Sequence, residues 1–298
     1  MTALLAPLGA QAVLTLLWLL HWLPLAALAP LGRALGRVLW VVGRSRRRIA
    51  LRNLELCFPE WNAAQRDSLA REHFQWLGRS LLERSLLWHA SPARLRRLIR
   101  VEGAVAYADT HSGPLMWLVP HFLGLDVAGA AIQLHIERPG CSIYQAQSNL
   151  VIDRALKRAR LRHGKAQIFS RKESAKPLLR AIKDGLGFFN LPDMDFGRKD
   201  AAFVPFFGVP AATLLAPSRM ARLLRMTVQP VVAEMLPGNQ GYRVRFLEPL
   251  TNFPTDDAVA DTVAINRWIE DEIRRNPAQY LWVHRRFKTR PLGEPSLY

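Results

Sequence analysis

The chain has 298 residues, half of them hydrophobic, and carries a net charge of +17 with an isoelectric point near 11.0. This length and composition exclude a disordered chain and predict a folded unit of catalytic size. The charge requires an acidic partner, which is nucleic acid, an anionic membrane surface or an acidic protein. The two cysteines, Cys57 and Cys141, exclude a disulfide framework, and neither has His or Cys neighbours at metal-ligand spacing. They favour a reducing compartment.

The N-terminal residues 1–32 contain no Asp, Glu, Lys or Arg. The apolar run from Leu4 to Leu31 exceeds the roughly 20 helical residues that cross a hydrocarbon layer, so we expect a membrane anchor helix over residues 1–32. Pro24 and Pro30 leave open a kinked or interfacial helix in place of one straight span. A cleaved signal peptide fits less well, because the basic n-region and a small-residue cleavage site are missing.

The excess of positive charge begins directly after this run. Residues 33–100 hold 15 Arg and Lys against 5 acidic residues, a net of +10, which leaves +7 for residues 101–298. The positive-inside tendency then predicts that the body of the protein lies in the cytoplasm, held against anionic headgroups of the inner membrane. A nucleic-acid-binding arm is the rival interpretation, and the preceding membrane-length segment makes it the poorer one.

Apolar residues at helical spacing predict an amphipathic helix from Asn62 to Ser91, within a basic helical segment, 33–100, that packs on the catalytic body. From Val101 onward strand and helix patterns alternate, which predicts an α/β domain over residues 101–298 with a mixed, largely parallel central sheet flanked by helices. The expected strands are 115–119, 141–145, 186–191, 228–233 and 242–247, and the expected helices are 125–133, 150–162, 174–184, 212–225 and 257–275.

The run 116–120 is apolar, ends in proline and is followed by His121, with Asp126 five positions further on. A continuously apolar run is typical of a strand covered on both faces, and the residues after it can start a helix. On one regular helix the two side chains would diverge by about 140°, so they can meet only if His121 lies in the turn before the helix. Asp126 would then orient the imidazole of His121 as a general base. The spacing alone is also compatible with an ordinary polar turn after a strand.

Several blocks, in this order along the chain, resemble the late acyltransferases of lipid A biosynthesis, the lauroyl and myristoyl transferases of Gram-negative bacteria. That family lies within the lysophospholipid acyltransferase group marked by His-x4-Asp. The blocks are Arg48-Ile49-Ala50-Leu51-Arg52-Asn53-Leu54, Cys57-Phe58-Pro59-Glu60, Pro120-His121 to Asp126, Arg171-Lys172-Glu173, Leu191 to Gly197, Phe203 to Thr213 and Gln279 to Pro291.

The resemblance implies transfer of a fatty acyl group from an acyl carrier protein thioester to a hydroxyl of a lipid A precursor, at the inner membrane and without a cofactor. His121 would be the catalytic base and Asp126 its partner. Two positions depart from the family pattern. Met194 replaces the usual Gln or His between Asp193 and Asp195, and Gln145 replaces an arginine after Tyr144, which puts the way lipid headgroups are held in doubt.

Phosphates on such an acceptor favour arginine, whose planar fork meets their oxygens bidentately. The candidates for substrate binding are Arg160, Arg162, Arg171 and Lys172, and for Arg160 and Arg162 a solvated surface position is an equally good interpretation. Asp193 is expected to brace the site and contact substrate. We expect no metal at Asp193 and Asp195, because thioester transfer does not require one.

Two alternatives remain open at this stage. The same chemistry can acylate a glycerophospholipid or a glycolipid mannoside. A non-catalytic basic protein that binds a membrane or nucleic acid would account for the charge alone.

Overall fold

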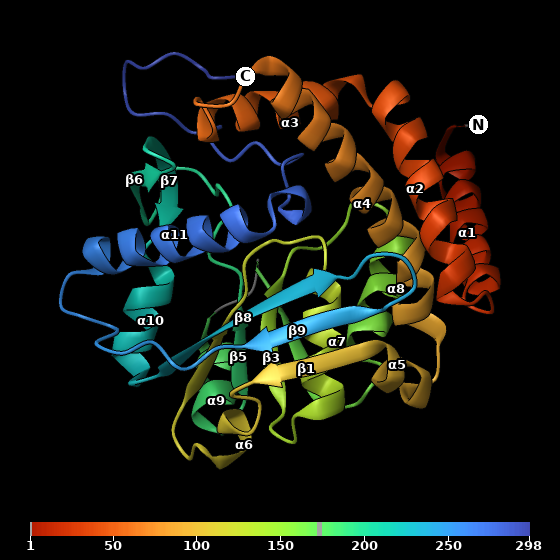
Figure 1. The fold of residues 1–298 in the computed structure, drawn as a ribbon. Coiled ribbons are helices and arrows are strands. Elements are labelled where there is room, and N and C mark those ends of the chain that lie inside the picture. Colours follow the sequence, from red (N-terminus) through yellow and green to blue (C-terminus); the bar gives the residue numbers. More distant parts are fainter. Residues whose placement is uncertain (1, 172–174) are drawn as a thin grey trace.

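The computed structural model describes residues 2–171 and 175–298 of the chain. At its centre lies a seven-stranded sheet with the order β1-β9-β8-β2-β5-β3-β4, flanked by helices (Figure 1). Every neighbouring pair is parallel except β8 and β9. The expectation of an α/β fold with a mixed, largely parallel sheet is therefore confirmed. The strands of this sheet are β1 (Ile99–Gly103), β2 (Leu115–Leu118), β3 (Gly140–Tyr144), β4 (Ala166–Ser170), β5 (Gly187–Asn190), β8 (Thr227–Met235) and β9 (Tyr242–Phe246).

The central position of β2 follows from its sequence, because all four of its side chains are apolar and buried. Alternate residues of β2 face opposite sides. Met116 and Leu118 join a core that includes α11, whereas Leu115 and Trp117 join a second core that includes α7. The helices that follow the basic segment are α5 (Pro92–Leu98), α6 (Tyr107–Thr110), α7 (Leu125–His135), α8 (Leu150–Leu161), α9 (Lys176–Lys183), α10 (Ala216–Leu224), α11 (Ala258–Arg275) and the 3-10 helix η1 (Pro277–Gln279).

Residues 201–214 form a separate hairpin of β6 (Ala201–Phe206) and β7 (Val209–Leu214), which the strands expected from the sequence do not include. Its two-residue turn, Phe207-Gly208, has positive φ at both positions, which is the turn that suits the twist of a two-residue hairpin. The expected helix 212–225 therefore begins only at Ala216.

Two helices occupy the N-terminal region where one anchor was expected. These are α1 (Thr2–Leu20) and α2 (Leu25–Val42), separated by a turn that ends at Pro24. They precede α3 (Arg44–Cys57) and the long helix α4 (Ala63–His89), which starts with a capping box between Asn62 and Gln65. Among the described residues only α2 has the length and composition of a membrane span, and 33 % of it is buried.

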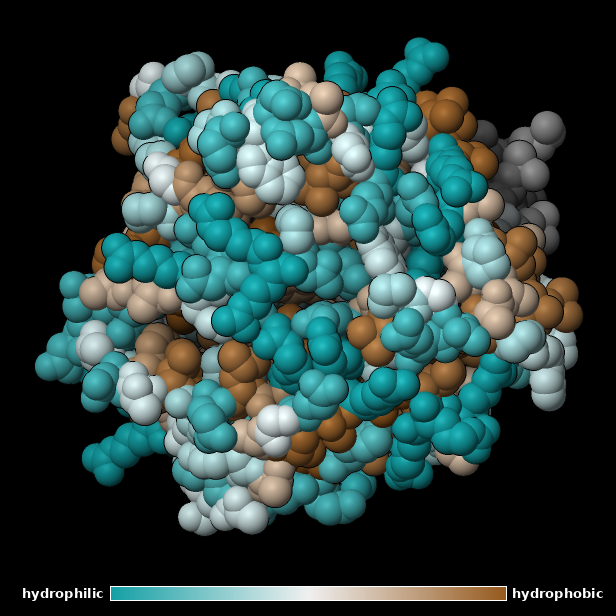
Figure 2. Space-filling model, in the orientation of Figure 1, coloured by the Kyte–Doolittle hydropathy of each residue, from teal (hydrophilic) through white to brown (hydrophobic). Residues whose placement is uncertain are grey.

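Helix α2 lies along α4 because glycines remove side chains where the two backbones cross. A Cβ on Gly36 would collide with the backbone of Phe74, and one on Gly78 would collide with Gly32. Helix α1 packs on α4 and α8 and leaves large apolar side chains exposed, including Val13, Leu16 and Leu19. Figure 2 shows a mostly hydrophilic face with hydrophobic groups along its right edge, where Figure 1 places α1.

Candidate active site

The ends of two neighbouring strands bring His121 and Asp193 together. Strands β2 and β5 pair in parallel, with Leu118 opposite Asn190, and each site residue follows its strand by three positions. In open parallel sheets the carboxyl ends of the strands share one edge, and ligands bind there. His121 lies in the turn before α7, as the sequence predicted.

The carboxylate of Asp193 holds His121 through two hydrogen bonds. Its Oδ1 accepts from Nδ1 of the imidazole at 2.6 Å, and its Oδ2 accepts from the backbone N–H of His121 at 2.9 Å. Burial alone would raise the pKa of Asp193, but the His121 ring and these hydrogen bonds outweigh burial and keep the pKa below its usual value. An ionised Asp193 can only accept, so the imidazole proton lies on Nδ1 and Nε2 carries the free lone pair.

The expected contact between His121 and Asp126 is wrong. The ring of His121 bonds to Asp193, whereas Asp126 faces Arg84 of α4 at 3.3 Å and Arg160 of α8 at 3.4 Å. The physical reason is topological: Asp193 follows the strand that pairs with β2, whereas Asp126 lies in the first turn of α7, which packs against α4 and α8. Burial would raise the pKa of Asp126, and the two guanidinium groups reverse that shift and lower it.

A segment near the C-terminus fixes the backbone around His121. The N–H of Leu281 donates to the carbonyl of His121 at 3.0 Å, and Phe122 forms an antiparallel bridge with Tyr280. The N–H of Leu123 donates to the carbonyl of Gln279 at 2.8 Å. The backbone of residues 121–123 is therefore held by main-chain contacts with residues 279–281.

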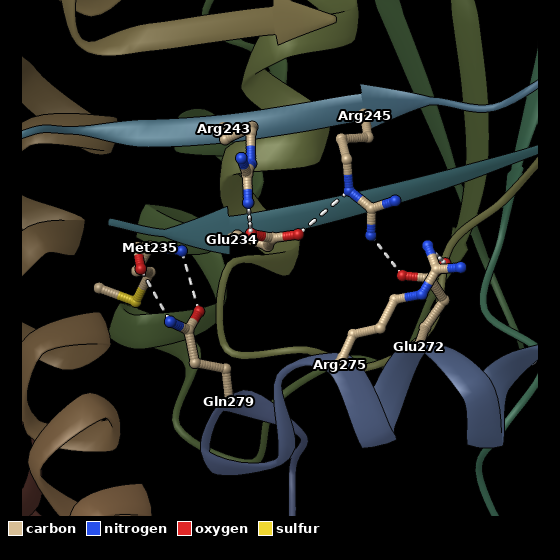
Figure 3. Close-up of polar contacts among 7 residues, drawn as sticks. All are labelled: Glu234, Met235, Arg243, Arg245, Glu272, Arg275 and Gln279. Carbon is tan, nitrogen blue, oxygen red and sulfur yellow. Dashed lines mark hydrogen bonds and ion pairs between the residues drawn. The ribbon is translucent and has the colours of Figure 1, made fainter. Parts of the chain in front are cut away.

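The side chain of Gln279 attaches this segment to the end of β8 (Figure 3). Its Oε1 accepts from the N–H of Met235 at 2.9 Å, and its Nε2 donates to the carbonyl of Met235 at 2.7 Å. One amide thus satisfies both backbone groups of a buried residue. Gln279 lies 158 residues after His121 in the chain. Its side chain links the segment that holds the backbone of His121 to the end of β8.

Ion pairs beside Gln279 join the β8–β9 hairpin to α11 (Figure 3). Glu234 accepts from Arg243 at 2.6 Å and from Arg245 at 3.1 Å. Arg245 also bonds to Glu272 of α11, which Arg275 approaches at 3.3 Å. Since α11 ends just before η1, this network supports the same segment that carries Gln279.

His121 and Asp193 line a small cavity of about 210 Å³ together with Asn53, Tyr280 and His284, among others. Asn53 donates to the carbonyls of Trp282 and His284, both at 2.7 Å, so α3 also anchors the C-terminal segment. Burial and the nearby His121 lower the pKa of His284 to about 4, which leaves it neutral near pH 7. Burial and then the charge of Asp193 raise the pKa of Tyr280 well above its ordinary value.

A larger cleft of about 870 Å³ opens beside this cavity. Its wall includes Leu125, four residues after His121, and Leu191, two residues before Asp193. Most of its lining is apolar, with Trp117 and Phe189 from the central strands and Asp126 and Arg160 as its charged pair. The cleft therefore combines an apolar interior, which suits a hydrocarbon chain, with the ion pair of Asp126 and Arg160.

The candidate phosphate-binding residues occupy different environments. Arg160 lines the cleft and pairs with Asp126, whereas Arg162 donates from both terminal nitrogens to the carbonyls of Leu87 and Ala90 at the end of α4. Arg171 is exposed and lies 3.9 Å over the ring of Phe196, which connects it to the loop after Asp193. Lys172 lies outside the described residues.

The second carboxylate of the Asp193-Met194-Asp195 turn braces the chain. Asp195 accepts from the backbone N–H of Gly197 at 2.9 Å and of Thr289 at 2.6 Å. Within residues 2–171 and 175–298 no group of three or more His, Cys, Asp or Glu side chains could hold a metal ion.

Sequence reasoning missed Arg84, Asn53 and Gln279 as supports of the site. Asn53 and Gln279 lie inside the blocks that resemble the acyltransferases, and their place in these blocks could have marked them as candidate site residues. Arg84 lies on α4 among alternating charges and carried no signal of its own, because its partner Asp126 is brought near only by packing of α4 on α7.

Comparison with known proteins defines the class. The family model for bacterial lipid A biosynthesis acyltransferases matches residues 3–289. A lipid A biosynthesis palmitoleoyltransferase of Escherichia coli K12 is 35 % identical over 96 % of this chain and 92 % of its own length. A lipid A biosynthesis lauroyltransferase of the same organism is 34 % identical over 95 % of this chain and 92 % of its own length. A lipid A biosynthesis myristoyltransferase of the same organism is 30 % identical over 91 % of this chain and 83 % of its own.

The protein is thus an acyltransferase. It belongs to the bacterial lipid A biosynthesis acyltransferase family, as the resemblance of the sequence implied.

Proposed function

We propose that this enzyme transfers a fatty acyl group from an acyl carrier protein thioester to a hydroxyl of a lipid A precursor. The observation that carries the proposal is the bond between Nδ1 of His121 and Asp193, which leaves the lone pair of Nε2 free in a residue that lines the small cavity. The family and the names of the relatives support the choice of a lipid A precursor as acceptor.

His121 acts as the general base and Asp193 as the residue that orients it. The acceptor hydroxyl attacks the thioester carbonyl carbon while Nε2 removes the hydroxyl proton, and the resulting imidazolium is stabilised by Asp193. When the tetrahedral intermediate collapses, the carbon–sulfur bond breaks and the imidazolium returns its proton to the departing sulfur. The products are an ester and a free thiol on the carrier, so the step is balanced without a cofactor or an acylated enzyme.

Asp126 is proposed to act on the substrate through arginines. It holds the half-buried guanidinium groups of Arg84 and Arg160, of which Arg160 lines the cleft, and they offer donors to an anionic group of the acceptor. Arg171, at the same edge of the sheet after β4, is proposed as a second phosphate contact. The apolar wall of the cleft is proposed to take hydrocarbon chain.

The enzyme is proposed to work at the cytoplasmic face of the inner membrane. Helix α1 exposes apolar side chains on several sides, and such a helix is stable where a bilayer surrounds it. Exposed Arg285 and Lys288, next to the site segment, offer a basic surface for an acidic carrier protein.

The test is an assay of the purified enzyme with an acyl carrier protein thioester and two acceptors, a phosphorylated disaccharide lipid and lysophosphatidic acid. We expect turnover with the disaccharide lipid and little with lysophosphatidic acid. Preference for lysophosphatidic acid would assign a glycerophospholipid acceptor instead, and binding of either lipid without turnover would support a non-catalytic lipid-binding protein. Trapping of an acylated side chain in the absence of acceptor would contradict direct transfer.

A further inference from the structure

A groove of about 1440 Å³ separates α1 from α8. One wall is the face of α1 that carries Leu14 and Trp18 together with the polar Gln11 and Thr15, and the other is the face of α8 that carries Arg154 and Arg158 one turn apart. The residues that line it include no Asp or Glu. It lies on the side of the molecule where α1, α4 and α8 meet (Figure 1).

The two walls point to one chemistry. Arg154 and Arg158 are exposed, and within the described part of the chain neither has a carboxylate within ion-pair distance. The neighbouring charged residues of α8 already form ion pairs: Lys157 pairs with Asp153, and Arg160 pairs with Asp126. Two unpaired guanidinium groups beside an exposed apolar helix suit an anionic amphiphile, with its phosphate at the arginines and its chains along α1.

The groove is distinct from the cleft beside His121. The two share only Trp88 and Ala159 in their linings, and α8 stands between them, with Arg160 turned to the cleft and Arg158 to the groove. An acceptor that reacts at His121 would occupy the cleft, so the groove is available to a different lipid. The exposed apolar side chains of α1 favour a molecule of the bilayer itself.

We infer that the groove between α1 and α8 is a binding site for one anionic glycerophospholipid, whose phosphate contacts Arg154 and Arg158. Such a lipid couples the N-terminal helix to the catalytic body and makes the position of α1 depend on acidic lipid in the membrane. The inference goes beyond the proposed function and does not require turnover.

The experiment is native mass spectrometry of the full chain, released from detergent micelles that contain equal amounts of phosphatidylglycerol and phosphatidylcholine. We expect one retained phosphatidylglycerol and about tenfold less phosphatidylcholine, the ratio that about 1.4 kcal/mol of charge-assisted contact produces. In the double variant Arg154→Gln/Arg158→Gln that preference falls to near unity. The matched control, Arg180→Gln/Lys183→Gln, removes the same charge from exposed positions of α9, which Figure 1 places away from α1, and keeps the preference.

Thermal unfolding of both variants in detergent checks that each is folded. Unchanged retention in the α8 variant, or an equal loss in the α9 control, would overturn the site. An increase of the acceptor KM in the α8 variant with phosphatidylglycerol retention unchanged would assign the groove to the acceptor and also overturn the inference. Loss of retention with kcat and KM unchanged supports it, whatever the acceptor proves to be.

Discussion

Two carboxylates near His121, the proposed general base, have different partners, and the difference shows that neighbouring strands in the sheet matter more for the contact than spacing along the chain. Asp126 is five residues from His121 in the chain but holds Arg84 and Arg160. Asp193 is 72 residues away and bonds to both the ring and the backbone of His121. Pairing of β2 with β5 determines the contact, and the short spacing in sequence does not.

The largest effect is expected for His121→Ala. Loss of the base should lower kcat by about 10²–10⁴-fold, the usual contribution of general base catalysis. Steady-state turnover with the acyl carrier protein thioester measures this, with thermal unfolding as the check that the variant is folded. Activity equal to that of the natural protein would remove His121 from the mechanism.

Asp193→Asn should be nearly as damaging. The amide cannot stabilise the imidazolium and favours the wrong tautomer, so we expect kcat to fall by about 10²–10³-fold with little change in KM. The separate values of kcat and KM give a second readout, because a residue that acts through the base lowers kcat and leaves KM nearly unchanged. A lower free energy of unfolding with kcat unchanged would mean that Asp193 supports only the fold.

His284 sharpens the comparison, because it shares the cavity of His121 without a role as base. Burial and His121 lower the pKa of His284 to about 4 in the folded protein. In the unfolded chain its imidazole takes up a proton below pH about 6.5, so between these two pH values only the unfolded state is protonated there. The free energy of unfolding should therefore fall by up to about 3 kcal/mol as pH decreases from 6.5 to 4. His284→Gln should reduce this loss while keeping most activity at pH 7.5, as denaturant titrations at several pH values and a turnover assay would show.

The support of the His121 loop by Gln279 can be tested separately. Gln279→Leu leaves the buried N–H and carbonyl of Met235 without partners, which should lower the free energy of unfolding by about 2–4 kcal/mol. It should also lower kcat several-fold, because residues 279–281 hold the backbone of residues 121–123. Arg243→Gln is the control from the same region, since its half-exposed ion pair contributes only about 0–1 kcal/mol. Equal destabilisation by the two substitutions would contradict the role of Gln279.

The smallest effect is expected for Asp126→Asn. The substitution releases Arg84 and Arg160 but leaves His121 in place, so we expect about a tenfold increase in the acceptor KM, equivalent to about 1.4 kcal/mol, and a nearly unchanged kcat. Arg160→Gln should give a similar increase. A raised KM with an unchanged kcat indicates a residue that binds substrate, whereas a lowered kcat with an unchanged KM indicates a residue that acts on the base.

Much of the fold could be predicted from sequence, because its signals are local. The apolar run of β2, the Asn62 cap of α4 and the alternation of strands with helices all report burial and chain direction within a few residues. The hairpin β6–β7 was missed because Pro205 and Pro210 are typical of loops, although they pair opposite each other in the antiparallel register.

The site was only partly predictable. His121 and Asp193 were both singled out, and their contact was not, since strand order is a property of the whole sheet. Knowing that parallel strands share a carboxyl edge, one can place both residues there but cannot say that β2 and β5 are neighbours. Arg84 and Gln279 act through contacts that packing creates, and a single sequence does not contain them.

The most direct measurement compares Asp193→Asn and Asp126→Asn in single-turnover reactions at saturating acceptor, so that binding differences disappear. We expect the rate of acyl transfer in Asp193→Asn to fall at least tenfold below that in Asp126→Asn, which should stay within a few-fold of the natural enzyme. If Asp126→Asn is instead as slow as His121→Ala while Asp193→Asn transfers acyl groups at nearly the natural rate, then Asp126 is the partner of the base and the pairing of His121 with Asp193 is not the catalytic one.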